Sequence, residues 1–238
     1  MLTVPKQYYG IADSSDAMRL ANDYANLQTW RFSNKCTLEQ CCGVIYDDFS
    51  RAEVPLAPHQ RTGCLFVCRA ILGLRDNRCR GALLADRQGF GKTRTSIAAM
   101  NVLTLLYRQN TTKQLKFIVA CTATLKTVWR NELQEANFAD MTVEICSHEG
   151  LAKVQRDRDT AIIVDEAHKC LSTKRYNLIR AGGFVFRLLL TGTPVQNSSF
   201  ELGRLLTLLH ITDVAPEVAL QQRDSIMLRR DNVADYIF

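Results

Sequence analysis

Long hydrophobic runs are missing from this sequence of 238 residues, which argues against a membrane protein. Its longest apolar stretches, such as residues 184–190, are interrupted by Arg187 and fall far short of the roughly 20 residues that cross a bilayer. The N-terminal stretch MLTVPKQYYGIADSS lacks a charged start followed by an apolar core, so we expect no secretion signal. We therefore expect an intracellular globular chain, in the nucleus or the cytoplasm, with no membrane partner.

Cysteine pairs at metal-binding spacing are missing as well. The nine cysteines are odd in number and irregularly spaced, which fits reduced thiols better than a disulfide framework. Zinc could be sought at Cys41 and Cys42, or at Cys64 and Cys68 with His59, but no second ligand pair follows at zinc-finger spacing. The sequence therefore favours free thiols over a metal site.

Charge is unevenly distributed, although the net charge of +6 is modest. Between residues 69 and 94 there are seven basic and two acidic residues, so this short stretch alone carries +5. Such a cluster suits a phosphate-bearing partner, either a nucleotide or a nucleic acid. A solvated, arginine-rich loop is the alternative, and charge alone does not choose between them.

Short apolar runs alternate with helical patterns over most of the chain. We expect helices at 17–27 and 56–74 and then at 93–109, 125–136, 172–181 and 199–209, and strands at 82–85, 116–121, 142–145, 161–164 and 187–190. Strands that are apolar at nearly every position are covered on both faces. The prediction is an α/β fold, a doubly wound parallel sheet with helices on both faces, after a mainly helical N-terminal extension. We divide the chain into the extension at 1–55, an ATP-binding domain at 56–215 and a C-terminal segment at 216–238.

The stretch GALLADRQGFGKT, residues 81–93, reads as a strand, a glycine-containing loop and the start of a helix. Backbone N–H groups of such a loop and the helix N-terminus suit polyphosphate; Lys92 would reach the β- and γ-phosphates and Thr93 would bind Mg²⁺. The strict pattern G-x-x-x-x-G-K-[ST] is not met, because Asp86 occupies the first glycine position, so an ordinary turn is the alternative. A second motif, AIIVDEAH, ends a strand with Asp165, suited to Mg²⁺, and Glu166, suited to orienting the attacking water.

In combination, DRQGFGKT, DEAH and LLLTGTPVQN resemble motifs I, II and III of superfamily-two helicases, and specifically the Swi/Snf-like DNA translocases. LAPHQRTG (56–63), FIVACTATLKTVWRNEL (117–133) and SIMLRRDNV (225–233) are similar to further segments of that family, so the resemblance covers residues 56–233. It implies a RecA-like lobe that binds ATP and Mg²⁺.

The resemblance also implies roles for individual residues. Gln60 would contact adenine, His168 would sense the nucleotide state, and Gln196 would act with motif III. The full set expected at the nucleotide is Gln60, Asp86, Gly89, Phe90, Gly91, Lys92, Thr93 and Arg94. Motif Ia, with Thr122, Ala123 and Thr124, would touch the DNA backbone, and Thr191, Gly192 and Thr193 would couple DNA to nucleotide. The expected partner is double-stranded DNA, with RNA as an alternative.

Departures from the family pattern define the remaining expectations. Arg87 and Phe90 replace the usual glutamate and leucine of the loop, Thr122 replaces proline, and the short spacing between Trp129 and Asp165 indicates a trimmed connection that would suit a viral relative. Relatives have a second RecA-like lobe that supplies catalytic arginines, and we expect it in cis or in trans. Arg229 and Arg230 are expected to be linker or surface residues.

Two other readings stay open. One is a non-catalytic nucleotide- or DNA-binding regulatory protein derived from such a lobe. The other is a small-molecule kinase, which gives no account of TGTPVQN or of the Gln60 segment.

Overall fold

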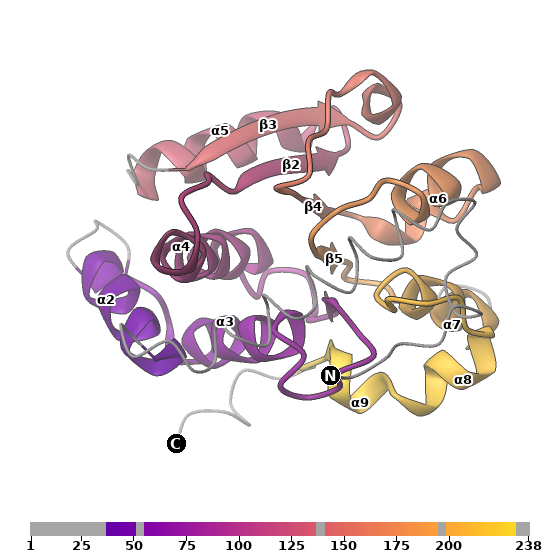
Figure 1. Ribbon diagram of the computed structural model, residues 1–238, viewed down its shortest axis with the longest axis horizontal. Coiled ribbons are helices and arrows are strands. Elements are labelled where there is room, and N and C mark those ends of the chain that lie inside the picture. The colour runs from indigo at the N-terminus through magenta and orange to yellow at the C-terminus, as the bar shows by residue number, and fades with distance from the viewer. Residues whose placement is uncertain (1–36, 51–54, 137–140, 195–198, 232–238) are drawn as a thin grey trace.

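A parallel sheet organises the computed structural model, which describes residues 37–50, 55–136, 141–194 and 199–231 (Figure 1). Its strands lie in the order β3-β2-β4-β5-β1-β6, and each pairing between them is parallel. The strands are β1 (Gly81–Leu84), β2 (Lys116–Cys121), β3 (Thr142–Ser147), β4 (Thr160–Val164), β5 (Arg187–Leu190) and β6 (Met227–Leu228). The doubly wound α/β fold is confirmed, and the first five strands match the expected ones within two residues.

Alternate side chains of each central strand enter two separate cores. In β2, Phe117 and Val119 face one core, while Ile118 and Ala120 face the other. This explains the nearly continuous apolar strands, because both faces of the sheet are buried. The first core is covered by helices α2 (Leu38–Ser50), α3 (Pro58–Ile71), α4 (Lys92–Asn110) and α5 (Leu125–Ala136). The second is covered by α6 (Thr173–Arg180), α7 (Ser199–Thr207), α8 (Pro216–Gln221) and α9 (Arg223–Ile226).

Helix α2 belongs to the first core, although the sequence suggested only an extension before residue 56. Its buried side chains are Leu38, Cys41, Cys42, Ile45 and Phe49, and they join the same cluster as α3 and α4. The helix expected at 17–27 lies outside the described residues. A packed helical segment therefore precedes α3 and extends the hydrophobic core of the lobe.

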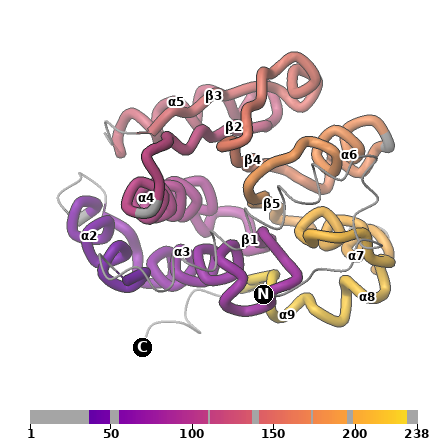
Figure 2. The backbone as a smooth tube through the Cα atoms, viewed as in Figure 1, coloured from indigo at the N-terminus to yellow at the C-terminus, as the bar shows by residue number. Residues whose placement is uncertain are grey.

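The C-terminal part returns to the sheet edge. Strand β6 pairs with β1, with Leu83 opposite Met227 and Leu84 opposite Leu228. This segment, yellow in Figure 2, therefore lies beside the strand that leads into the glycine-containing loop. Neither β6 nor α8 and α9 was expected from the sequence.

The thiols agree with the expectation of reduced cysteine. Eight cysteines of the described ranges are buried and form no disulfide bond there. Across the described ranges, three or more His, Cys, Asp or Glu side chains nowhere come together as a metal cage. None of the helices in the part of the chain that the structure describes is long and apolar enough to pass through a membrane.

Replacing Ile45 with alanine should lower the free energy of unfolding by about 2–5 kcal/mol, because a side chain only 2% exposed leaves a cavity in the first core. The neighbouring Val44→Ala, at a side chain 50% exposed, should change it by less than about 0.5 kcal/mol. Urea unfolding of the two variants and the parent chain measures the difference. Equal effects would contradict the packing of α2 into the core.

Candidate functional site

Three neighbouring strands deliver the expected motifs to one edge of the sheet. Strands β4, β5 and β1 are adjacent and parallel, so their carboxyl ends meet on the same side. Asp165 follows β4, Thr191 follows β5, and Asp86 begins the loop after β1. In parallel α/β sheets, ligands bind at this edge, beyond the carboxyl ends of the strands.

Two glycines give the loop between β1 and α4 its shape. Gly89 has φ 89° and Gly91 has φ 68°, both in the region that favours glycine. Gly91 is the N-cap of α4, and a Cβ there would lie 2.1 Å from Gln60 Nε2. The loop thus delivers backbone N–H groups and a helix N-terminus to the sheet edge, an arrangement suited to anions.

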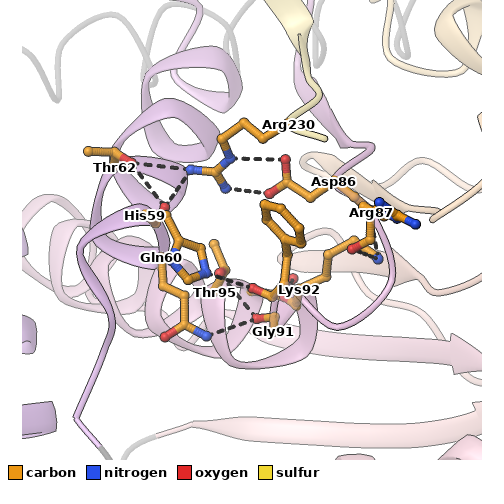
Figure 3. Close-up of polar contacts among 11 residues, drawn as sticks. His59, Gln60, Thr62, Asp86, Arg87, Gly91, Lys92, Thr95 and Arg230 are labelled. Atoms are coloured by element: carbon orange, nitrogen blue, oxygen red, sulfur yellow. Dashed lines mark hydrogen bonds and ion pairs between the residues drawn. The ribbon is translucent and has the colours of Figure 1, made fainter. Parts of the chain in front are cut away.

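Lys92 is the first residue of α4, and its ammonium turns back over the loop. Lys92 Nζ donates to the carbonyl oxygens of Asp86 at 2.8 Å and Arg87 at 3.3 Å (Figure 3). Burial lowers the pKa of Lys92, while the carboxylates of Asp165, Asp86 and Glu166 act to raise it. Lys92 and both DEAH carboxylates lie at the same carboxyl edge of the parallel sheet, after β1 and after β4.

Asp165 is almost fully buried, at 7% exposure, and is held by two donors. Trp129 Nε1 donates to Oδ2 at 2.9 Å, and the Glu166 backbone N–H donates to Oδ1 at 2.9 Å. Burial raises the pKa of Asp165, and these two hydrogen bonds and the charge of Lys92 oppose the rise. Helix α5 therefore positions this carboxylate through Trp129, which the sequence had singled out only as a motif match.

Glu166 sits in a constrained backbone conformation. Its φ is 52°, and among the described residues other than glycine it alone has a positive φ. Left-handed backbone at such a residue is rare and is concentrated at functional sites. A 3₁₀ turn, Ala167–Cys170, follows directly and directs His168 back toward Glu166, whose Oε2 lies 3.4 Å from His168 Nδ1.

His168 links the DEAH segment to the segment after β5. Its Nδ1 lies 2.8 Å from Thr191 Oγ1 and 3.5 Å from Thr193 Oγ1. Burial lowers the pKa of His168, which favours the neutral ring. Thr191 Oγ1 also accepts the backbone N–H of Thr193 at 3.1 Å, so one hydroxyl connects both segments.

Gly192 lies directly over the loop. A Cβ at this position would stand 3.5 Å from the Gln88 backbone nitrogen and 3.7 Å from Lys92 Nζ. The segment after β5 and the loop between β1 and α4 are therefore neighbours. Gln196, expected to act with them, lies outside the described residues.

Gln60 and His59 bring the N-terminus of α3 to the other side of the loop. Gln60 Nε2 donates to the Gly91 carbonyl at 3.4 Å, and its Oε1 accepts the Ala57 N–H at 2.9 Å, which caps the helix. His59 Nε2 lies 3.1 Å from the Phe90 carbonyl oxygen, and the two rings meet edge to face at 5.6 Å. The loop is thus packed against α3 by side chains of both segments.

Arg230 was predicted to be a linker or surface residue, and this prediction is wrong. Its guanidinium is buried and forms a two-pronged ion pair with Asp86, which is also buried. The reason is topological, because β6 runs beside β1 and carries Arg230 to the loop. Arg229 has a side chain 39% exposed and pairs with Asp231.

Two further loop-proximal residues differ in their surroundings. Thr93 is in the first turn of α4, half-buried beside Lys92. Arg94 is buried, with its guanidinium within 3.4 Å of Glu132 and Glu135 on α5 and over the ring of Phe49. The contacts of Arg94 therefore join α2, α4 and α5.

The basic stretch at 69–94 is not one surface. Several of its guanidiniums have local partners: Arg69 pairs with Glu39, Arg78 with Asp76, and Arg75 donates to the carbonyl oxygens of Asp224 and Ser225. Arg94 is bound to α5, so the basic side chains of this stretch point to different parts of the fold and do not form a single patch.

Motif Ia lies beyond the carboxyl end of β2, on the same edge of the sheet. Thr122 Oγ1 and Thr124 Oγ1 are 3.1 Å apart, and Ala123 and Thr124 are exposed. Lys126, in the first turn of α5, comes directly afterwards. This short exposed segment is accessible to a large ligand.

A divalent cation fits the carboxylates at the centre of the site. Mg²⁺ takes one or two carboxylates and completes its shell with water and phosphate oxygens, so a full protein cage is not needed. Asp165 and the Thr93 hydroxyl are oxygen donors of this kind, beside a lysine suited to phosphate. The residues present therefore fit a magnesium nucleotide.

Several known proteins have sequences similar to this chain. The model of the SNF2-related domain family matches residues 138–221. The DNA repair and recombination protein RAD54B of Gallus gallus is 28% identical over 182 residues, which cover 63% of this chain and 20% of that protein. The uncharacterized ATP-dependent helicase YqhH of Bacillus subtilis is 29% identical over 223 residues, 81% of this chain and 37% of that protein. The chain thus spans well under half the length of either relative.

A solved structure has the same fold. The Sulfolobus solfataricus SWI2/SNF2 ATPase core, in complex with dsDNA, matches with a TM-score of 0.60 over 76% of this chain and 46% of that one. The two sequences are 19% identical over the match, so this likeness concerns the fold.

Trp129→Phe should raise the pKa of Asp165, because the hydrogen bond from the indole N–H stabilises the charged carboxylate. Carbon-13 NMR titration of labelled aspartate carboxyls measures the change. Phe117→Leu, at another fully buried aromatic in the same core, serves as the packing control and should leave the Asp165 pKa unchanged. The same Asp165 pKa in Trp129→Phe and the parent chain would contradict this role of Trp129.

Proposed function

We propose that the chain is a Swi/Snf-like ATPase lobe of helicase superfamily two. In this proposal it is the ATP-binding motor lobe of a DNA-dependent translocase. The observation that carries the proposal is that the loop with Lys92 and the segment with Asp165 and Glu166 follow β1 and β4, whose carboxyl ends lie at one edge of the parallel sheet. An ammonium beside two carboxylates, one of them in a strained backbone, suits phosphoryl transfer to water.

Each residue of the site has a part in the proposal. The loop N–H groups at Gly89, Phe90 and Gly91 bind phosphate oxygens, and Lys92 neutralises charge on the β- and γ-phosphates. Thr93 and Asp165 hold Mg²⁺, which supplies charge neutralisation when bound. Glu166 orients the attacking water. Gln60 contacts adenine, from the side of the loop where it already meets Gly91.

His168 carries the proposed coupling between nucleotide and DNA. Its contact with Thr191 joins the DEAH segment to the TGTPVQN segment, and Gly192 lies within reach of Lys92. A change at the γ-phosphate would therefore act on Thr191 and Thr193 through short contacts. Gln196 is assigned to the same coupling role.

Double-stranded DNA is the proposed partner, with RNA as the alternative. The proposed contacts are to the phosphate backbone, from the exposed segment Thr122, Ala123 and Thr124. The SWI2/SNF2 core with the same fold is in complex with dsDNA, which supports the assignment. A DNA partner also agrees with an intracellular location, in the nucleus or cytoplasm.

A second RecA-like lobe completes the proposed motor. Arginines that stabilise charge on the γ-phosphate are worth about 10³- to 10⁵-fold in rate in phosphoryl transfer. Within the lobe described here, Arg230 is bound to Asp86 and is not directed at the carboxylates. The catalytic arginine is therefore assigned to the second lobe, in cis or in trans.

Lys92→Ala should weaken binding of Mg·ATP by about 10- to 100-fold, because charge-assisted hydrogen bonds to phosphate are worth about 1.5–3 kcal/mol. Displacement of a fluorescent ATP analogue measures the affinity. Lys113→Ala is the matched control. Lys113 is 61% exposed and precedes the amino end of β2, at the edge of the sheet opposite the site. With the second lobe present, Glu166→Gln should slow phosphate release by about 10²- to 10⁴-fold.

The outcomes separate the two functions. Unchanged affinity in Lys92→Ala would remove the nucleotide assignment. Tight binding with no phosphate release, even with DNA and a second lobe, would favour the non-catalytic regulatory protein.

Affinity for DNA should fall steeply with salt and depend little on sequence, because the proposed contacts are to phosphates. Lys126→Ala should lower the slope of log affinity against log salt by about 1, for one lost phosphate contact. Lys113→Ala, at the opposite edge of the sheet, should leave the slope unchanged. Fluorescence anisotropy with two unrelated duplexes at several salt concentrations measures both, and equal slopes in the two variants would exclude Lys126 from the interface.

A further inference from the structure

The guanidinium of Arg230 lies between the two segments that flank the proposed nucleotide site (Figure 3). Its side chain is 2% exposed and that of Asp86 is 1% exposed. Arg230 Nε donates to Asp86 Oδ1 at 3.0 Å, and a terminal nitrogen donates to Oδ2. The planar fork of arginine matches a carboxylate in this two-pronged way, and lysine does not.

The other terminal nitrogen of the same guanidinium binds α3. It donates to the His59 carbonyl oxygen at 2.5 Å and to Thr62 Oγ1 at 3.2 Å. Gly63 makes room for this approach, since a Cβ there would stand 2.9 Å from the guanidinium. One side chain thus contacts the first turns of α3 and the start of the phosphate loop.

Backbone hydrogen bonds fix Arg230 relative to the loop. The Ala85 N–H donates to the Leu228 carbonyl at 2.7 Å, and the Arg87 N–H donates to the Arg230 carbonyl at 3.2 Å. The guanidinium therefore extends from a backbone already paired with the loop. From there the guanidinium reaches α3, so the side chain links α3 to that loop.

Both segments held by Arg230 carry residues assigned to ATP. The loop carries Gly91 and Lys92 for the phosphates, and α3 carries Gln60 for adenine. Gln60 touches the loop itself at Gly91 by a long contact of 3.4 Å, weaker than the charged links of Arg230. His59 adds a contact to the Phe90 carbonyl oxygen at 3.1 Å, so Arg230 supplies the charged link among several contacts between the two sides.

We propose that Arg230 is a positioning residue that keeps the adenine side and the phosphate side of the nucleotide site in register. It acts through Asp86 on the loop and through His59 and Thr62 on α3, without touching the nucleotide. The proposal rests on the function proposed above. A ligand that spans both sides should depend on Arg230, and a ligand that fills only the phosphate side should not.

The test uses a variant that removes the polar link and keeps the lobe folded. Arg230→Met alone would leave the Asp86 charge buried and unpaired, so Arg230→Met is combined with Asp86→Leu, because apolar replacement of a whole buried ion pair is often tolerated. Circular dichroism and urea unfolding check the fold. Arg229→Met, at the neighbouring exposed arginine, is the matched control.

Affinities for Mg·ATP and for magnesium tripolyphosphate are measured by displacement of the same fluorescent analogue. In the double variant, the loss of affinity should be about 10- to 100-fold larger for Mg·ATP than for tripolyphosphate, because only Mg·ATP spans both sides of the site. The affinity of Arg230→Lys for Mg·ATP should lie between those of the parent chain and the double variant, because a single ammonium replaces the two-pronged guanidinium. Arg229→Met should match the parent chain for both ligands.

Two results would overturn the proposal. A folded double variant with parental affinity for Mg·ATP would make the ion pair purely structural. Equal losses for both ligands would mean that the pair shapes only the phosphate loop. Failure of the proposed function gives a different pattern, in which the parent chain binds neither ligand or Lys92→Ala binds both normally.

Discussion

Parallel pairing of β4, β5 and β1 is the constraint on which the site depends. Three strands that are distant in sequence end at the same edge only because all three run in one direction. Their side chains are buried on both faces, so a shift of one residue would exchange the two cores and is strongly disfavoured. The loop, the DEAH acids and the TGTPVQN segment are thereby fixed at one edge without direct bonds among all of them.

Elements with a dense local signal were predictable from the sequence. Strands β2 and β4 are almost entirely apolar. Helix α4 begins just after Gly91 and α5 just after Thr124, and both have apolar residues at helical spacing. Helix α2 does carry a helical pattern, with apolar residues at 38, 41, 42, 45 and 49, but the interpretation of the first 55 residues as an extension left it unassigned, whereas β6 has only two half-buried residues. Periodicity does not reveal the packing partners, which are α3 and α4 for α2 and the distant β1 for β6.

Within the site, spacing identified the motifs but not the contacts that orient them. Lys92, Asp165 and Glu166 were predicted from the motif pattern, and they follow strands that end at the same edge of the sheet. Arg230 is the opposite case, because an arginine near a chain end is usually solvated and only the path of β6 takes it into the interior. Trp129 shows the intermediate situation: its position in a motif was visible, while its hydrogen bond to Asp165 depends on how α5 packs.

The C-terminal segment is attached to the loop after β1, so a force on this segment would be transmitted to that loop. The backbone at 228–230 is bonded to residues 85–87, and Arg230 adds a charged link to the same place. A pull on the chain beyond Asp231 would load the phosphate loop before it strained the central strands. Tension in the polypeptide would then act on the same few atoms that shape the loop between β1 and α4.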